Sequence, residues 1–257
     1  MEKSEPLIAV RDLTVGYGNN VIQHDLNFTI NRGDIFIIMG GSGSGKSTLL
    51  RSMVGLLPPI QGQVLYEGLN FWAAEPEGQK GIMRKFGMLY QSGALWSSLT
   101  LAENVALPLQ QYTDLSPGQI NKIVSLKLAL VGLAGFEEYY PSEISGGMKK
   151  RAGLARAMAL DPEILFFDEP SAGVDPISAH LLDELIIELR NSLGATVVVV
   201  THELASIFEI GNNSVFLDAD KKTMTAAGDP TKLLTESSDP KVISFLTRGK
   251  RRTQETQ

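Results

Sequence analysis

Residues 40–48, GGSGSGKST, carry the clearest indication of chemistry in this sequence. Four of the six residues from 40 to 45 are glycines, and a backbone without Cβ atoms lets several N–H groups converge on one anion. The spacing fits G-x-x-x-x-G-K-[ST], in which the loop cradles the phosphates of a nucleoside triphosphate, the lysine reaches the β- and γ-phosphates and the next hydroxyl binds Mg²⁺. The expected phosphate site comprises Gly40, Gly41, Ser42, Gly43, Ser44, Gly45, Lys46, Ser47 and Thr48.

The sequence on both sides of this loop supports the interpretation. The apolar run DIFIIMG before it predicts a strand, and TLLRSMVGLL after it predicts a helix whose N-terminus adds partial positive charge. A flexible Gly/Ser linker is the alternative, but a linker would not place Lys46 and Ser47 at this register between a strand and a helix.

Two adjacent carboxylates end another apolar run, ILFFDEP at residues 164–170. The ends of parallel strands gather ligands in open α/β sheets, so Asp168 and Glu169 are candidates for one reaction centre. We expect Asp168 to hold Mg²⁺ through water, and Glu169 to orient and deprotonate the water that attacks the γ-phosphate. Solvated acids at a strand end are the alternative, which the upstream phosphate loop makes weaker.

Three further side chains are candidates for the same centre. His202 ends VVVVTH and Gln91 ends MLYQ; we expect His202 to contact the γ-phosphate and Gln91 to sense Mg²⁺ and water, although a lone histidine at a strand end is more often a packed residue. Tyr17, in the Gly-rich VGYGNN, is a candidate to stack on adenine or a surface aromatic of a hairpin. One tyrosine does not decide between the two.

A second candidate anion site begins at Ser145. Ser145, Gly146 and Gly147 stand before a helix-like run and offer a hydroxyl and backbone amides suited to a phosphate. Since one nucleotide already occupies the first loop, both sites are used only if two chains pair head to tail. The second site of one chain then covers the nucleotide of the other, so we expect a homodimer.

Length and composition narrow the class of protein. The 257 residues are near the upper limit for one core, which favours one domain with an inserted subdomain over two independent domains. A net charge of −6 argues against coating nucleic acid through a general basic surface. The absence of cysteine excludes disulfides and Cys-ligated zinc. No apolar run approaches the ~18 residues of a membrane span, so we expect a chain that does not cross a membrane by itself.

The candidate residues are expected on the elements of a parallel α/β sheet. Strand-like runs alternate with helical patterns in the second half of the chain. Residues 164–202 read as a βαβ unit whose helix begins at Asp175-Pro176 and ends at Gly194. Residues from about 92 to about 155 are helix-like throughout, which makes them a candidate inserted helical subdomain.

The chain after Gly228 is expected to form a tail, residues 230–257. Two short helices are predicted there, beginning at Asp229-Pro230 and Asp239-Pro240, before a basic end. Disorder of the last ten residues is one interpretation of that end; docking on an acidic surface of a second subunit or on anionic lipid headgroups is the other. The basic residues are Arg248, Lys250, Arg251 and Arg252.

Taken in order, these motifs resemble the nucleotide-binding subunit of an ATP-binding cassette (ABC) transporter over residues 7–229. The resemblance implies a P-loop NTPase (RecA-like) fold, α/β with a parallel-sheet core, an antiparallel β edge and an inserted helical subdomain. It also implies that ATP and Mg²⁺ are the cofactors, and that Ser47, Gln91 and Asp168 are the metal ligands. The family's signature is LSGGQ, and Met148 here removes a polar contact near the nucleotide of the partner. The implied motifs are the A-loop at Tyr17, Walker A at GGSGSGKS, the Q-loop at Gln91, the signature at ISGGM, Walker B at ILFFDE, the D-loop at SAGVD, which ends at Asp175, and the switch histidine His202.

Shorter blocks resemble the MlaF-type ATPases of MCE-linked phospholipid transporters. These blocks are SGGM, QSGALWSSLTLAENVALPL and DEPSAGVDPIS. The resemblance implies a separate MlaE-like permease, an MCE lipid-binding subunit and a STAS-domain protein as partners, no nucleic acid, and a peripheral position on the cytoplasmic face of the inner membrane. Other transported substrates, a soluble ABC ATPase acting on nucleic acid or ribosomes, and a non-hydrolysing nucleotide-gated module are the alternatives.

The segment after Gln91 is a candidate docking surface for the permease. Leu95, Trp96 and Leu99 are expected to be exposed and to border a groove for a cytoplasmic helix. For Trp96 alone, a place in the core of the helical subdomain is an equally good interpretation.

Overall fold

The computed structural model describes residues 6–249 and divides into two compact units. The first combines Met1–Ala74 with Val200–Gln257, and the second is Glu75–Val199. Helices and strands occur in both units, and both contain parallel strand pairs, as the sequence predicts.

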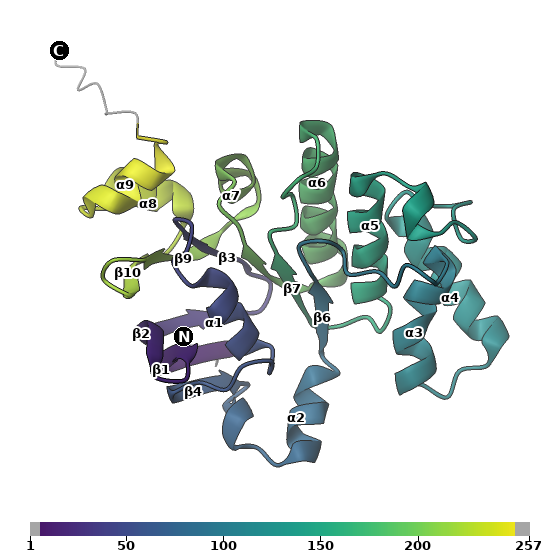
Figure 1. Cartoon of the computed structure of the whole chain (residues 1–257), viewed down its shortest axis with the longest axis horizontal. Coiled ribbons are helices and arrows are strands. Elements are labelled where there is room, and N and C mark those ends of the chain that lie inside the picture. Colours follow the sequence, from purple (N-terminus) through teal and green to yellow (C-terminus); the bar gives the residue numbers. More distant parts are fainter. Residues whose placement is uncertain (1–5, 250–257) are drawn as a thin grey trace. The chain divides into compact units, whose positions relative to one another are not determined.

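An antiparallel sheet opens the first unit, with β1 (Ile8–Tyr17), β2 (Asn20–Ile30), β4 (Gln61–Tyr66) and β5 (Leu69–Asn70) in the order β2-β1-β4-β5 (Figure 1). Ile8 of β1 pairs with Ile30 on one side and with Tyr66 on the other. Near the end of β2, buried Leu26, Phe28 and Ile30 alternate with exposed polar residues, the pattern of a sheet with one solvated face. This sheet is the predicted antiparallel edge.

The first unit also holds β3 (Ile35–Gly40), β9 (Asn213–Asp218) and β10 (Thr223–Ala227). All six residues of β3 are buried, which is why its sequence is a continuous apolar run. β3 pairs in parallel with β9, Gly40 opposite Leu217, and β10 adds to β9 in the antiparallel sense. The strand β3 therefore delivers its last residue, Gly40, to the start of the glycine-rich loop.

Helices complete the first unit: α1 (Lys46–Met53), α7 (Leu204–Ile210), α8 (Pro230–Glu236), α9 (Pro240–Leu246) and the short 3₁₀ turn Phe71–Ala73. The two Asp-Pro helix starts are confirmed, because Asp229 and Asp239 each accept the N–H two residues further on, at 2.8 Å. Of the predicted basic end, Arg248 follows α9, whereas Lys250, Arg251 and Arg252 lie outside the described residues.

The second unit contains β6 (Phe86–Leu89), β7 (Ile164–Asp168), α6 (Pro176–Leu193) and β8 (Thr196–Val200), the last residue of which belongs to the first unit. β6 and β7 are parallel, from Phe86 opposite Ile164 to Leu89 opposite Phe167. The predicted βαβ helix is confirmed: Asp175 caps its start and Gly194, at φ 65°, ends it.

Between β6 and β7 the chain is helical, with α3 (Leu101–Tyr112), α4 (Pro117–Leu130), the 3₁₀ turn Pro141–Glu143 and α5 (Gly146–Ala157). These helices pack against one another (Figure 1), and residues 92–155, all of them described, contain no strand. The helical character predicted for this stretch is confirmed. A further helix, α2 (Pro76–Met83), precedes β6.

A buried asparagine on α3 holds the irregular segment before this helix. The Nδ2 atom of Asn104 lies 3.1, 3.1 and 2.8 Å from the carbonyl oxygens of Trp96, Leu99 and Thr100. Its Oδ1 accepts the N–H of Trp96 at 2.7 Å. One fully buried side chain therefore fixes the backbone from Trp96 to the start of α3.

We expect Asn104→Ala to lower the free energy of unfolding by about 1–3 kcal/mol, because it removes the four hydrogen bonds by which this side chain holds the backbone before α3. Urea denaturation followed by circular dichroism measures the effect. Asn121→Ala, at an exposed position of α4, is the matched control and should change stability by less than about 0.5 kcal/mol. Equal stability of the two variants would contradict the role assigned to Asn104.

Candidate functional site

The loop after β3 requires glycine at two positions. A Cβ on Gly40, whose φ is 150°, would lie 2.5 Å from the carbonyl oxygen of Leu217 and 2.7 Å from the Oγ of Ser44. A Cβ on Gly45, at φ 86°, would lie 2.6 Å from Ile22. All three distances are shorter than real Cβ contacts, so these glycines are required for the loop to pack against its neighbours.

Lys46 is buried and its ammonium group is held over this loop. Its Nζ donates to the carbonyl oxygens of Gly40 at 3.0 Å and Gly41 at 3.1 Å. The same residue begins α1, so the partial positive charge of the helix N-terminus falls at the loop. A cation, a helix terminus and a bare backbone at one place form a site for an anion with several phosphates.

Tyr17 and His202 belong to the same unit as this loop. Tyr17 ends β1 with 47% of its surface exposed, and its hydroxyl accepts a hydrogen bond of 2.8 Å from Arg51 of α1. This bond lowers the pKa of Tyr17. His202 follows Thr201, whose N–H donates to Ile38 of β3 at 3.3 Å, so its backbone lies near the end of β3.

Asp168 and Glu169 lie in the second unit, at the end of β7. Glu169 is left-handed, with φ 49°, an uncommon conformation for a residue with a side chain. Lys150 of α5 is 5% exposed and donates from Nζ to the carbonyl oxygen of Glu169 at 3.2 Å. Burial lowers the pKa of Lys150, while the charges of Glu169 and Asp168 act in the opposite direction.

The predicted second anion site is the start of α5. Ser145 is the N-cap and its Oγ accepts the N–H of Met148 at 3.2 Å. A Cβ on Gly147 would lie 2.6 Å from the Oγ of Ser178, in the first turn of α6. Asp175 caps α6, and the hydrogen bond from the Ser178 hydroxyl lowers the pKa of Asp175. The starts of α5 and α6 therefore touch through Gly147 and Ser178.

Gln91 lies exposed in the turn after β6, and this turn is held from α5. Arg156 donates from its guanidinium to the carbonyl oxygens of Ala94 at 2.7 Å and Gly93 at 3.0 Å. The three candidate metal ligands are Ser47, Gln91 and Asp168, and each offers a side-chain oxygen. Oxygen is the ligand type that Mg²⁺ prefers when phosphates supply the rest of its coordination shell.

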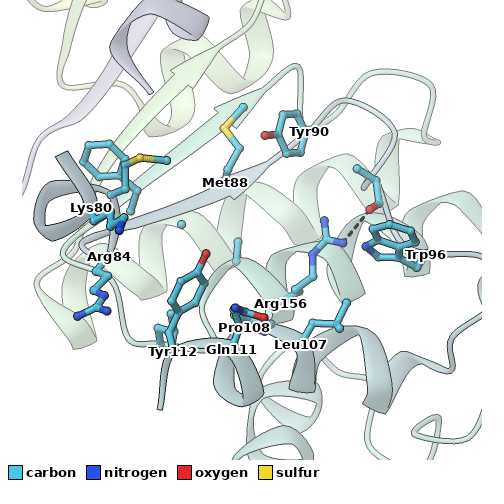
Figure 2. A pocket seen from close by; sticks show the side chains of 16 residues that line it. Lys80, Arg84, Met88, Tyr90, Trp96, Leu107, Pro108, Gln111, Tyr112 and Arg156 are labelled. Atoms are coloured by element: carbon cyan, nitrogen blue, oxygen red, sulfur yellow. Dashed lines mark hydrogen bonds between the residues drawn. The ribbon is translucent and has the colours of Figure 1, made fainter. Parts of the chain in front are cut away.

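A cavity of about 790 Å³ lies beside this turn, within the second unit. Its walls include Met88, Tyr90, Trp96, Tyr112 and Arg156 (Figure 2). Trp96 is 64% exposed, so the interpretation that it belongs to the core is wrong. The expectation for its neighbours needs correction too: Leu95 and Leu99 are half-buried rather than exposed, in a segment whose backbone is held by Asn104 of α3 at Trp96 and Leu99.

The predicted site residues thus fall into two groups, one in each unit. The first unit carries the phosphate loop, Tyr17 and His202. The second carries Gln91, Asp168, Glu169, the segment from Ser145 to Met148, and Asp175.

A family model described as "ABC transporter" matches residues 23–172, more than half of the chain. The chain belongs to the ABC transporter ATPase family. It is 41% identical over 240 residues to the intermembrane phospholipid transport system ATP-binding protein MlaF of Escherichia coli K12, covering 93% of this chain and 88% of MlaF. The resemblance to this family and to its MlaF-type members is confirmed.

Two other comparisons extend this result. The chain is 40% identical over 239 residues to the probable ribonucleotide transport ATP-binding protein mkl of Mycobacterium tuberculosis H37Rv, covering 93% of this chain but 66%, less than two thirds, of mkl. A dimeric structure of a post-hydrolysis state of the ATP-binding cassette MJ0796, bound to ADP and Pi, superposes with a TM-score of 0.78 at 28% identity. It covers 86% of this chain and 98% of that one. Within residues 6–249, no helix is long and apolar enough to cross a membrane.

Two supporting residues of this ABC ATPase were missed by sequence reasoning, namely Lys150 and Arg156. Both donate to backbone carbonyls of segments that carry motif residues, and neither belongs to a motif. The available signal was weak: both are basic residues on a helix otherwise rich in alanine and glycine. Because their partners are 19 and 63 residues away along the chain, only the folded structure reveals the contacts.

We expect Lys150→Met to lower the ATPase kcat by about 10- to 100-fold, because the Glu169 carbonyl keeps the N–H of Ala172 but loses the Lys150 ammonium, and small misplacements of catalytic groups are costly. The Kd for MgATP should stay near the wild-type value. Lys150→Arg, which keeps a donor, should retain more activity. Lys122→Met, at an exposed position of α4, is the control for loss of a lysine. A wild-type kcat in Lys150→Met would contradict this role.

Proposed function

We propose that this protein is the ATP-binding and hydrolysing subunit of a transporter that moves phospholipids between membranes. The observation that carries the proposal is the 41% identity to MlaF over 93% of the chain, because MlaF is named for that transport. ATP-driven closure of a dimer would power a separate MlaE-like permease, with an MCE lipid-binding subunit and a STAS-domain protein as further partners. The protein would lie at the cytoplasmic face of the inner membrane as a peripheral subunit.

Each site residue has a proposed role in this reaction. The loop from Gly40 to Thr48 would hold the phosphates, and Lys46 would exchange its carbonyl partners for phosphate oxygens. The Mg²⁺ that accompanies ATP would neutralise phosphate charge, with Ser47, Asp168 and Gln91 as its protein ligands. Glu169 would accept the proton of the attacking water. The remaining assignments are adenine stacking by Tyr17 and a γ-phosphate contact by His202.

The start of α5 is proposed to act on the partner's nucleotide. The segment Ser145–Gly146–Gly147–Met148 offers a hydroxyl and helix N-terminal amides. Asp175, which caps α6 beside it, would contribute to the same contact between subunits. The support for a dimer is the similarity to MJ0796, whose structure is described as dimeric and bound to ADP and Pi.

Ribonucleotides are a second candidate substrate class, since mkl is named as a probable ribonucleotide transport protein. Purification of the native complex from detergent extract separates the two candidates. Recovery of an MCE subunit with bound phospholipid supports lipid transport. Recovery of a complex that contains neither an MCE subunit nor bound phospholipid, and that takes up labelled ribonucleotide, would favour ribonucleotide transport instead.

The roles of Glu169 and Lys46 predict different defects. Glu169→Gln should lower turnover by about 10²–10⁴-fold, retain ATP binding and accumulate as a closed dimer, because the water loses its proton acceptor while the phosphate contacts stay. Lys46→Ala should weaken nucleotide binding itself. Steady-state hydrolysis, calorimetric titration with nucleotide and size-exclusion chromatography measure these effects. Wild-type turnover by Glu169→Gln would refute the assignment of the base.

The cavity beside Trp96 is proposed to receive a cytoplasmic helix of the permease. Its lining combines apolar and aromatic side chains with the cations Lys80, Arg84 and Arg156, a combination that suits an amphipathic helix. The support for this proposal is that the cavity lies next to the turn that carries Gln91. Arg156 lines the cavity and donates to the carbonyl of Ala94 in that turn. Movement of a bound helix would thereby reach the Mg²⁺-sensing residue.

We expect Trp96→Ala to reduce recovery of the permease and lipid transport by about tenfold or more, since exposed tryptophans at interfaces often contribute over 2 kcal/mol to binding. The melting temperature of the isolated subunit should change little, because the side chain is exposed. Co-purification and differential scanning calorimetry test both points. Leu193→Ala, at an exposed apolar position on α6, is the control; equal loss of permease with it would contradict the proposal.

A further inference from the structure

A fully buried glutamine lies beneath the phosphate loop. The Nε2 atom of Gln23, on β2, donates to the carbonyl oxygen of Ser44 at 2.8 Å and to that of Asp218 at 3.1 Å. Ser44 is in the phosphate loop, and Asp218 is the last residue of β9. Because both partners accept, the side-chain atom between them must be the amide nitrogen. One amide therefore joins the loop to the end of a neighbouring strand.

Gln23 also contacts the loop through packing. A Cβ on Gly45 would lie 3.0 Å from the Cγ of Gln23, so the side chain fills the space directly below the loop. Ser44 is itself buried, and its N–H donates to the carbonyl of Gly41 at 3.2 Å. A displacement of Gln23 would be felt at Ser44 and Gly45, immediately before Lys46.

The carboxylate of Asp218 connects this contact to the C-terminal helix α9. It is buried and accepts the N–H groups of Asp220 at 2.7 Å and Lys221 at 3.1 Å. The Nζ of Lys241, in the first turn of α9, donates to it at 2.8 Å. The hydrogen bond from Lys241 lowers the pKa of Asp218, so this carboxylate is ionised at neutral pH.

Further contacts fix α9 to this end of β9. Lys241 donates to Asp220 at 2.6 Å, and Lys221 donates to Asp239, the N-cap of α9, at 3.3 Å. The ring of Phe245 meets that of Phe216 on β9 edge to face, with centroids 5.3 Å apart. The helix therefore cannot move without disturbing Asp218.

We propose that Gln23 is a positioning residue for the phosphate loop, and that the series Lys241–Asp218–Gln23–Ser44 lets helix α9 set the affinity for nucleotide. This inference rests on the proposed function in one respect, that residues 40–48 bind a nucleotide. The physical reason is preorganisation: a loop held in its binding conformation loses less entropy when the phosphates arrive. Without the Gln23 amide, two buried carbonyls lose their donor and the loop relaxes.

The test compares full-length variants by calorimetric titration with MgADP, which is not hydrolysed. Gln23→Met keeps the length of the side chain and removes the donor, so the Kd should rise about three- to tenfold. Lys241→Met should raise it about two- to threefold, and Lys241→Arg should return it to the wild-type value. At saturating ATP the kcat of each variant should change less than its Kd, because preorganisation of the loop acts on the binding step.

Lys232→Met, at an exposed position of α8, is the matched control and should leave the Kd unchanged. A lowered melting temperature with a wild-type Kd in Gln23→Met and Lys241→Met would overturn the inference, because both residues would then serve folding alone. Should Gln23→Met not fold, the Lys241→Met and Lys241→Arg pair decides by itself. Failure of the wild-type chain to bind MgADP would remove the proposed function as well, whereas normal wild-type binding with unchanged variants overturns this inference only.

Discussion

The first unit depends on one constraint, the close approach of the backbone at Gly40 to the backbone of β9 at Leu217. A Cβ there would come within 2.5 Å of the carbonyl of Leu217, so β3 and β9 stay paired to the end of β3 only because this residue is glycine. The same residue supplies a carbonyl to Lys46. Strand pairing, the direction of the loop and the position of the ammonium group are therefore fixed together. Glycine is therefore needed at position 40 for contact with neighbouring backbone, and at position 45 for contact with the side chains of Ile22 and Gln23.

In the second unit, helix α5 is the element on which several candidate site residues depend. Its N-cap, Ser145, begins the signature segment, Lys150 one and a half turns later supports Glu169, and Arg156 near its end holds the turn after Gln91. Both cations are largely removed from water, a cost that their hydrogen bonds to carbonyl oxygens offset. Because one helix carries all three attachments, we expect a displacement of Ser145 to be accompanied by displacement of the backbone at Glu169 and in the turn after Gln91.

Much of the fold and of the candidate site could be predicted from the sequence wherever neighbouring residues determine the structure. The phosphate loop, the βαβ unit with Asp175 and Gly194 at the ends of its helix, and the Asp-Pro starts of α8 and α9 all follow from neighbouring residues and their spacing. The partial burial of Leu95 and Leu99 was not predictable in this way, because the backbone of their segment is held by Asn104, which lies further along the chain. Helix α2 has one weak stretch, PEGQKGIM, with two glycines and was not predicted. Contacts of Gln23, Lys150 and Arg156 lie beyond sequence reasoning, since each joins residues distant along the chain.

One property is common to Gln23, Lys150 and Arg156 and separates them from the motif residues. Each is a long polar side chain, largely or fully buried, whose terminal nitrogen donates to a main-chain carbonyl of a functional segment. Every residue has a main-chain carbonyl, so such a contact does not restrict the residue type in the segment that accepts the hydrogen bond. On the donating side, several residue types carry a suitable N–H group. Motif residues, in contrast, must match the ligand and are restricted in type. Two ABC ATPases with identical motifs can therefore differ in affinity and turnover through their supporting residues, and a motif alone does not fix either quantity.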